Sequence, residues 1–198
     1  GDLPLPEVLE VMTILETIRR FREVGVLGMN RRNADYIMPS NPRSLFPLVD
    51  DKLITKQLAE ANQIPTPPLY QVIEHHGDIS RLEKELVGYR DFVIKPARGA
   101  GGSGIVLVKD HTEGGFIKQN GEVILMKDLT YHISDILSGI YSLEGLEDRA
   151  LVEALVHPDT IFDAVTYCGV PDIRVIVYRG VPTITMVRLP TQASDGKA

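Results

Sequence analysis

Apolar residues recur every three to four positions in several parts of the chain, a spacing typical of helices with one packed face. In the first such segment Val8, Leu15 and Ile18 share a face. Asp and Ser residues before the other segments are expected N-caps, because their side chains accept backbone N–H groups of the first turn. The predicted helices span residues 6–22, residues 50–62 after Asp50 or Asp51, a segment through Val87 after Asp78 or Ser80, and residues 129–142 after Asp128.

Short apolar runs bounded by glycine, proline or asparagine predict strands. Asn120-Gly121 separates two such runs and predicts a type I′ hairpin turn. A second tight turn is expected at Arg179-Gly180. The predicted strands cover residues 69–73, the two ends of residues 91–108, the hairpin 116–125, and residues 149–156, 164–167, 172–178 and 181–189.

The order of these elements predicts an α+β fold with a cleft between two lobes, because helix–strand units give way to a run of antiparallel strands. Residues 28–37 are read as a loop, and residues 38–47 are also expected to form loop, since their three prolines lack the N–H that a helix needs. The predicted division is an N-terminal helix and substrate-side segment (1–49), a lobe with a glycine-rich flap (50–148), and a partial C-terminal lobe (149–198).

The most informative stretch runs from Asp91 to Val108, where an apolar run ends in Lys95 and a glycine-rich loop leads to a second apolar run. Two strands joined by such a loop form a flap whose N–H groups can close over phosphates. A floppy polar hairpin is the alternative, but the number of glycines exceeds what a turn requires. The loop glycines are Gly99, Gly101, Gly102 and Gly104, and Lys95 lies at the base.

Composition narrows the class of partner. The net charge is −6 and the pI about 5.4, and no basic face is evident, which disfavours nucleic acid. The single cysteine, Cys168, excludes an internal disulfide and fits a reducing compartment. No apolar run reaches the length of a membrane span and no leader pattern opens the chain, so the sequence predicts a cytoplasmic protein.

A few polar residues outside the flap are candidates for binding. Arg31 and Arg32 either bind a carboxylate or phosphate of the substrate or form a basic turn paired with Asp35. Lys52 lies in the first turn of its predicted helix, where the helix dipole disfavours a cation. It is either an ordinary surface lysine or one kept there for binding.

Three features in order resemble the ATP-grasp superfamily of ATP-dependent carboxylate ligases. They are Asp51-Lys52 at a helix start followed by Ile64-Pro-Thr-Pro67, the Val93-Ile-Lys-Pro96 run with its glycine flap, and a strand with Glu153 followed by the strand from Asp172. The stretches 28–33, 47–52 and 188–197 are similar to the α-L-glutamate-ligase-like branch, related to ribosomal-protein glutamate ligases. The resemblance implies a nucleotide in the cleft between two lobes.

The resemblance also implies residue roles. In such ligases a carboxylate attacks the γ-phosphate of ATP, and an amine then displaces phosphate from the acyl-phosphate to form an amide. Lys52 and Lys95 would contact the α- and β-phosphates, and the flap would cover the β- and γ-phosphates with Ser103 as a hydroxyl donor. Adenine would lie against Glu153 and the backbone of Ala154 and Leu155, and Arg188 and Lys197 would contact the γ-phosphate or acyl-phosphate.

Some of these assignments leave alternatives. Asp172 is placed to accept from the ribose hydroxyls, although His157 or Asp159 can take that role. Arg174 is either a contact of its own or a structural partner of Asp172, since the two share a strand face. Without the resemblance, Glu153 reads as an exposed charge on a half-buried strand.

The resemblance further implies Mg²⁺, whose carboxylate and asparagine ligands are expected beyond residue 198. The C-terminal lobe is therefore expected to be incomplete and these 198 residues alone inactive. A non-catalytic ATP-grasp module that serves as a scaffold or sensor is the alternative function. Expected partners are ATP, a carboxylate substrate and an amine acceptor, with a partner protein or a second copy of the chain also possible.

Overall fold

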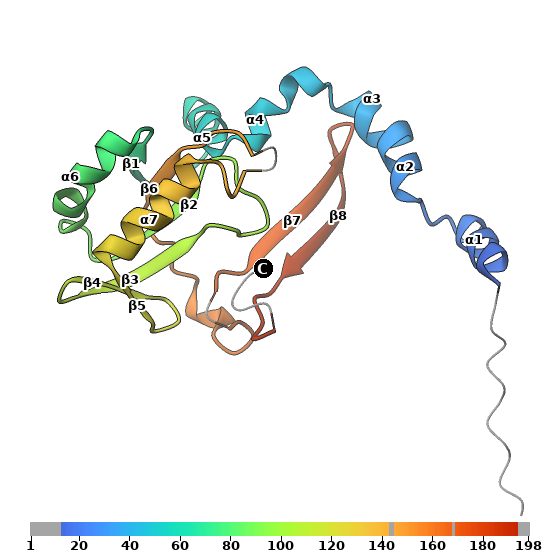
Figure 1. The fold of residues 1–198 in the computed structure, drawn as a ribbon. Coiled ribbons are helices and arrows are strands. Elements are labelled where there is room, and N and C mark those ends of the chain that lie inside the picture. The colour runs from blue at the N-terminus through green and yellow to red at the C-terminus, as the bar shows by residue number, and fades with distance from the viewer. Residues whose placement is uncertain (1–12, 143–144, 168, 194–198) are drawn as a thin grey trace, which may run out of the picture. The chain divides into compact units, whose positions relative to one another are not determined.

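The computed structural model describes residues 13–142, 145–167 and 169–193. Contacts within the chain divide it into two units, Gly1–Phe46 and Pro47–Ala198. The α+β fold predicted from the sequence is confirmed, with helices and antiparallel strands in the second unit (Figure 1). Among the described residues, no helix has the length and apolar character needed to cross a bilayer.

The first unit is a series of short helices in which no described residue is buried. Thr13 caps α1, since its hydroxyl accepts from the N–H of Glu16 and the Glu16 carboxylate accepts from the N–H of Thr13. The prediction of loop over residues 28–47 is wrong. Its prolines precede short helices or lie in their first turns, where a missing N–H costs nothing. The helices are α1 (Ile14–Glu23), α2 (Met29–Arg32), a π-helical segment (Asn33–Ile37), α3 (Met38–Ser40) and a 3₁₀ turn (Arg43–Leu45).

The second unit is built on a six-stranded antiparallel sheet of order β1-β6-β2-β3-β4-β5. β6 is the last of these strands in sequence, yet it lies between β1 and β2. The strands are β1 (Leu69–Ile73), β2 (Phe92–Pro96), β3 (Val106–Thr112), β4 (Gly115–Lys118), β5 (Val123–Leu125) and β6 (Ala150–Glu153), and the helices are α4 (Pro47–Asp50), α5 (Lys52–Ala61), α6 (His76–Leu86) and α7 (Met126–Leu137).

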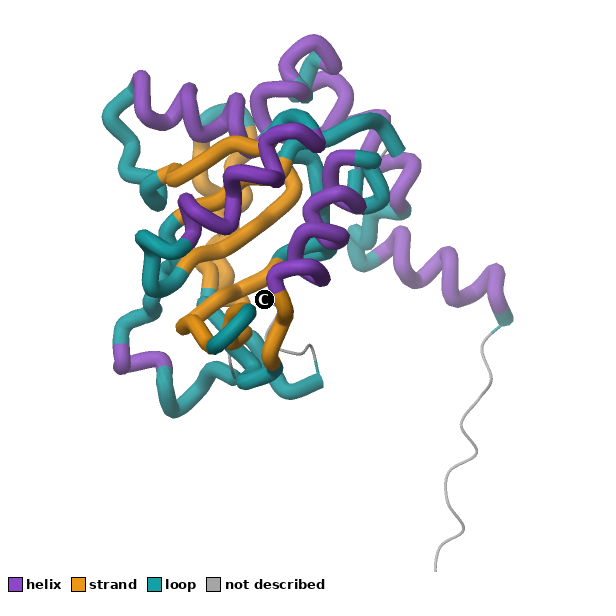
Figure 2. The backbone as a smooth tube through the Cα atoms, turned by 60° about the vertical axis from the view of Figure 1, so that its left-hand side comes forward, coloured by secondary structure: helices purple, strands orange, loops and turns teal. Residues whose placement is uncertain are grey.

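The two faces of this sheet differ in how they are covered. Helices α6 and α7 cover one face of the sheet (Figure 2). They form the main apolar core with the strands, in which Phe92, Ile94 and Val152 are fully buried. A smaller cluster around Leu53 of α5 and Leu151 of β6 lies on the other face. Successive side chains of a strand point to opposite faces of the sheet. The polar residues that alternate with the buried positions of β2 and β6 therefore lie on the face that α5 covers.

A separate two-stranded sheet follows, formed by β7 (Asp172–Tyr178) and β8 (Val181–Arg188). Its apolar side chains are exposed along both strands, including Ile173 at 67% and Val181 at 61% of their full accessible surface. The hairpin turns at Arg179 and Gly180, as predicted, and both have positive φ.

Several local predictions are corrected. Residues 164–167 are not a strand; they follow a 3₁₀ turn (Thr160–Phe162), and their N–H groups bond back to Phe162 at two positions. The N-cap of α7 is Leu125 instead of Asp128, and that of α6 is His75, whose N–H donates to Asp78. The turn at Asn120-Gly121 is not type I′, because only Gly121 has positive φ.

Candidate nucleotide-binding site

Glu153 is buried beside Lys95, because β6 lies next to β2. Val93 is opposite Glu153 and Lys95 is opposite Leu151, so the two charged side chains share the α5 face. Lys95 Nζ is 2.5 Å from Glu153 Oε2, and Glu153 is only 2% exposed. The interpretation of Glu153 as an exposed charge is therefore wrong. Its carboxylate is a fixed negative group within the sheet.

Lys56 of α5 is a second cation on the same carboxylate. Its Nζ is 3.4 Å from Glu153 Oε1, 3.1 Å from Thr66 Oγ1, and also donates to the carbonyl of Pro67. Lys56 is 6% exposed. Sequence reasoning missed this residue, although its position four residues after Lys52 on one helix face was a usable signal.

Lys52 contacts the base of the glycine flap. Its backbone N–H donates to the carbonyl of Ala97 at 2.9 Å, and its Nζ donates to the carbonyls of Ala97 at 3.3 Å and Gly99 at 2.5 Å. Burial and then the charge of Lys95 lower the pKa of Lys52, against the opposing effects of Asp148, Asp51 and Glu153. Lys52 therefore lies close enough to Lys95 for the charge of Lys95 to disfavour its own protonated form.

The flap joins β2 to β3 through a loop whose shape depends on glycine. Gly101, Gly102 and Gly104 have positive φ values of 62°, 76° and 75°. Gly99 lies so close to Pro96 that a Cβ would be 2.3 Å from its Cγ. Ser103 is exposed at the turn and donates its N–H to Ala100.

The far end of the flap rests on His132 of α7 and on Tyr141, which follows that helix. A Cβ on Gly104 would be 2.7 Å from the ring of Tyr141. His132 Nε2 donates to the carbonyl of Gly104 at 2.9 Å, which leaves Nδ1 to accept from the Tyr141 hydroxyl at 3.3 Å. His132 thus holds the flap end in place, consistent with a packing role.

The near end of the flap is anchored by a network of charged side chains. Both oxygens of Asp148 accept from the N–H of Arg98, at 3.1 and 3.0 Å, and one accepts from the N–H of Arg149 at 2.7 Å. Arg149 Nη2 is 2.5 Å from Asp51 Oδ2, and Arg98 Nε is 3.5 Å from the same oxygen. Burial works to raise the pKa of Asp51, but backbone N–H groups of α5 and Arg149 lower it overall. The network joins the start of α5, the start of the flap and the start of β6.

A flap with two lysines at its base is an arrangement suited to a polyphosphate, and a comparison with known families agrees. A family model described as sugar-transfer associated ATP-grasp matches residues 31–198. The chain belongs to this ATP-grasp family. Membership supports an ATP-dependent, ligase-like function in general terms. No match is found among curated proteins or among solved structures.

In this ATP-grasp chain the predicted adenine segment continues β6. The N–H of Ala154 donates to the carbonyl of Pro68 at 2.9 Å, and Ala154 and Leu155 are half-buried. The strand therefore leads directly from Glu153 to the backbone groups that were predicted to lie against the base.

The predicted ribose and γ-phosphate residues of the ATP-grasp chain pair with each other. Asp172 and Arg188 are opposite across β7 and β8, and Arg188 binds both carboxylate oxygens, with Nε at 2.6 Å. This pairing lowers the pKa of Asp172 and raises that of Arg188. Among the described residues no hydrogen bond or ion pair joins the pair to Lys52 or Lys95. Lys197 lies outside the described residues.

The alternative ribose residues also have partners. His157 Nε2 is 3.0 Å from Asp91 Oδ2, and Asp159 accepts from the N–H of Ile161 at 2.9 Å. In the first unit Arg31 Nε is 3.1 Å from Asp35 Oδ2, and Arg32 donates to Asn33. The Arg31 pair is the one that the sequence offered as the alternative to substrate binding.

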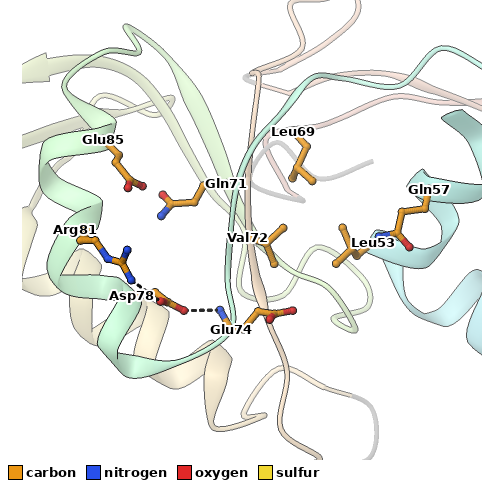
Figure 3. Close-up of a pocket in the computed structure, with 9 residues that line it drawn as sticks. All are labelled: Leu53, Gln57, Leu69, Gln71, Val72, Glu74, Asp78, Arg81 and Glu85. Atoms are coloured by element: carbon orange, nitrogen blue, oxygen red, sulfur yellow. Dashed lines mark hydrogen bonds and ion pairs between the residues drawn. The ribbon is translucent and has the colours of Figure 1, made fainter.

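A hollow of about 530 Å³ lies elsewhere in the ATP-grasp chain, between α5, β1 and α6 (Figure 3). None of the predicted nucleotide contacts lines it. Across the described part of the chain, no group of three His, Cys, Asp or Glu side chains is arranged to hold a metal ion. The hollow is lined by Leu53, Gln57, Leu69, Gln71, Val72, Glu74, Asp78, Arg81 and Glu85.

Proposed function

We propose that this protein is an ATP-dependent carboxylate–amine ligase that works through an acyl-phosphate. The observation that carries the proposal is the convergence of Lys52 and Lys95 beside a glycine flap on the α5 face of the sheet. An anion between the two ammonium groups would relieve the unfavourable effect of each charge on the other. Membership of the ATP-grasp family makes ATP the expected source of that anion.

The residues present fit a triphosphate. An ammonium group has three donors; Lys52 directs two of its own to flap carbonyls, and Lys95 is ion-paired with one oxygen of Glu153. Donors therefore remain for the α- and β-phosphates. Flap N–H groups, with the Ser103 hydroxyl, would cover the β- and γ-phosphates. We assign adenine to Glu153, Ala154 and Leu155, the ribose to Asp172, and the γ-phosphate or acyl-phosphate to Arg188 and Lys197.

The proposed reaction has two steps. A substrate carboxylate oxygen attacks the γ-phosphorus, the bond to the β-phosphate oxygen breaks, and ADP leaves. An amine then attacks the acyl carbon, an amide forms, and inorganic phosphate leaves with a proton lost from the nitrogen. The lysines bind and orient ATP, and closure of the flap would exclude water from the acyl-phosphate. The described residues do not assemble ligands for Mg²⁺, so no step is assigned to the metal.

The substrate pair follows from two different arguments. The likeness to glutamate ligases favours a glutamate-like acid, and Arg31 and Arg32 are the residues we assign to an acidic substrate. The description of the matching family, in contrast, links that family to sugar transfer. Taking both arguments together, we propose that the amine acceptor is either an amino acid or an amino sugar.

Titration of the complete protein with ATP–Mg²⁺ and candidate substrates tests the function. ADP release that requires both a carboxylate and an amine is the expected result. ATP binding without ADP release under any pairing would favour the alternative, a nucleotide-binding scaffold. Absence of ATP binding would overturn both.

A further inference from the structure

Two lysines share the carboxylate of Glu153, but they are held differently. Lys56 is 6% exposed, donates hydrogen bonds to Thr66 and the Pro67 carbonyl, and forms an ion pair with Glu153. The Lys95 side chain is 22% exposed, and its Nζ contacts one oxygen of Glu153. Lys56 is therefore fixed in place, and Lys95 is the cation of this pair that can turn toward another anion.

The free-energy cost of moving Lys95 away from Glu153 depends on whether another cation remains beside the Glu153 carboxylate. A buried carboxylate that loses its only cation is strongly destabilised, because desolvation is no longer offset by an opposite charge. Lys56 approaches the other oxygen, Oε1, so Glu153 retains a cation after Lys95 leaves Oε2. Nucleotide binding can then draw on Lys95 without leaving an unpaired charge in the sheet.

We infer that Lys56 is a positioning residue that keeps the charge of Glu153 compensated and so leaves Lys95 free to bind ATP phosphate. The inference rests on the proposed nucleotide site. It differs from a merely structural role, in which Lys56 only fastens α5 to the Thr66–Pro67 segment. A structural role would not depend on the charge of Glu153.

The test is a double-mutant cycle with Lys56→Met and Glu153→Gln. In the protein with Glu153 intact, we expect Lys56→Met to weaken ATP binding about tenfold, which corresponds to about 1.4 kcal/mol. In the Glu153→Gln background the same change should leave the dissociation constant unaltered. Lys56→Arg, which keeps the charge, should bind ATP as the wild type does, and Lys84→Met on the exposed face of α6 is the matched control.

A second measurement reports on Lys95 without nucleotide. Trace acetylation followed by peptide mass spectrometry should label Lys95 about threefold more slowly in Lys56→Met, because Glu153 then holds Lys95 alone. Labelling should be faster than wild type in Glu153→Gln, a variant that remains informative if Lys56→Met does not fold.

The outcomes separate the two proposals. If wild-type protein does not bind ATP but Lys95 labelling follows the expected order, the proposed function fails and the coupling of Lys56 to Lys95 stands. If Lys56→Met weakens ATP binding equally with and without the charge of Glu153, Lys56 is structural and the inference is overturned. Unchanged Lys95 labelling in Glu153→Gln would also overturn it.

Discussion

At the scale of single residues, the candidate site is defined by charged side chains that are largely buried. Each of them would raise the free energy of the folded protein if it had no partner of opposite charge. Lys52 and Lys95 each lie close enough to affect the other, and Glu153 compensates Lys95 from within the sheet. The fold already places both lysines beside the flap, and of the two only Lys95 has to turn, away from Glu153, when a polyanion arrives.

Replacement of Lys95 by alanine should abolish ATP binding without unfolding the protein. Glu153 keeps Lys56 in this variant, so no buried carboxylate is left alone. Isothermal titration with ATP and circular dichroism would check both parts. Lys84→Ala is the control, because Lys84 is an exposed residue of α6. Unchanged ATP affinity in Lys95→Ala would remove the lysine from the site.

ATP affinity should fall with rising pH, and the fall should begin below the 10.5 of an ordinary lysine. Burial and Lys95 lower the pKa of Lys52 in the free protein, whereas bound phosphates favour its charged form and raise that pKa. Affinity is therefore full while Lys52 is protonated in the free protein and decreases between the two pKa values. Dissociation constants measured from about pH 7 to about pH 10 would show this. Lys52→Met should bind weakly and lack this dependence, and a flat wild-type profile would contradict the expectation.

At the scale of elements, the flap combines a loop that needs glycine with two anchored ends. Gly101 has positive φ but open space around the position of a Cβ, whereas Gly104 has both positive φ and the Tyr141 ring in the way. The two positions therefore separate backbone strain from steric conflict.

Gly104→Ala should destabilise the protein more than Gly101→Ala. A non-glycine residue in this backbone region costs roughly 1 to 3 kcal/mol, and Gly104→Ala adds the displacement of Tyr141 from its contact with His132. Urea unfolding of both variants would measure the difference. Equal losses would mean that the Tyr141 ring moves freely, and the flap end would then not be anchored as described.

The start of the flap should depend on Asp148 in a similar way. Asp148→Asn replaces one accepting oxygen by an amide that faces the N–H groups of Arg98 and Arg149, so we expect a loss of about 1 to 3 kcal/mol in unfolding free energy. We also expect weaker ATP binding, since the flap starts at Arg98. Glu147→Gln, an exposed neighbour, is the matched control. Wild-type stability and ATP affinity in Asp148→Asn would show that the flap start does not need this carboxylate.

The sequence predicted most helices and strands because their periodic patterns are local. It missed the short helices near Pro39 and Pro47 because these prolines were expected to exclude a helix. A proline in the first turn does not exclude a helix; it only prevents the helix from extending toward the N-terminus. It also missed the burial of Glu153 and the role of Lys56, which depend on the position of β6 between β1 and β2. The pairing of strands that are far apart in the sequence cannot be recognised from the residue pattern of either strand alone.

At the scale of the whole molecule, the buried core belongs to the second unit. Apart from Pro190, every buried apolar residue in the described chain lies between Leu53 and Val152, and the first unit contributes none. Exposed apolar side chains remain on α1 and along β7 and β8.

Removal of residues 1–46 should therefore leave the second unit folded. We expect the melting temperature of residues 47–198 to stay within about 4 °C of the intact chain, since no core contact is lost. Calorimetry of both proteins would test this. A large drop would show that the first unit stabilises the second, against the division by contacts.

The position of β6 has a consequence for biosynthesis. A ribosome releases Leu69–Ile73 and Phe92–Pro96 well before Ala150–Glu153, yet the latter segment is the shared neighbour of the other two. While β6 is still inside the exit tunnel, the nascent chain can pair β2 through β5 as a meander, but β1 has no partner in the sheet. The nucleotide site, in which Lys95 is paired with Glu153, is thus assembled late in translation.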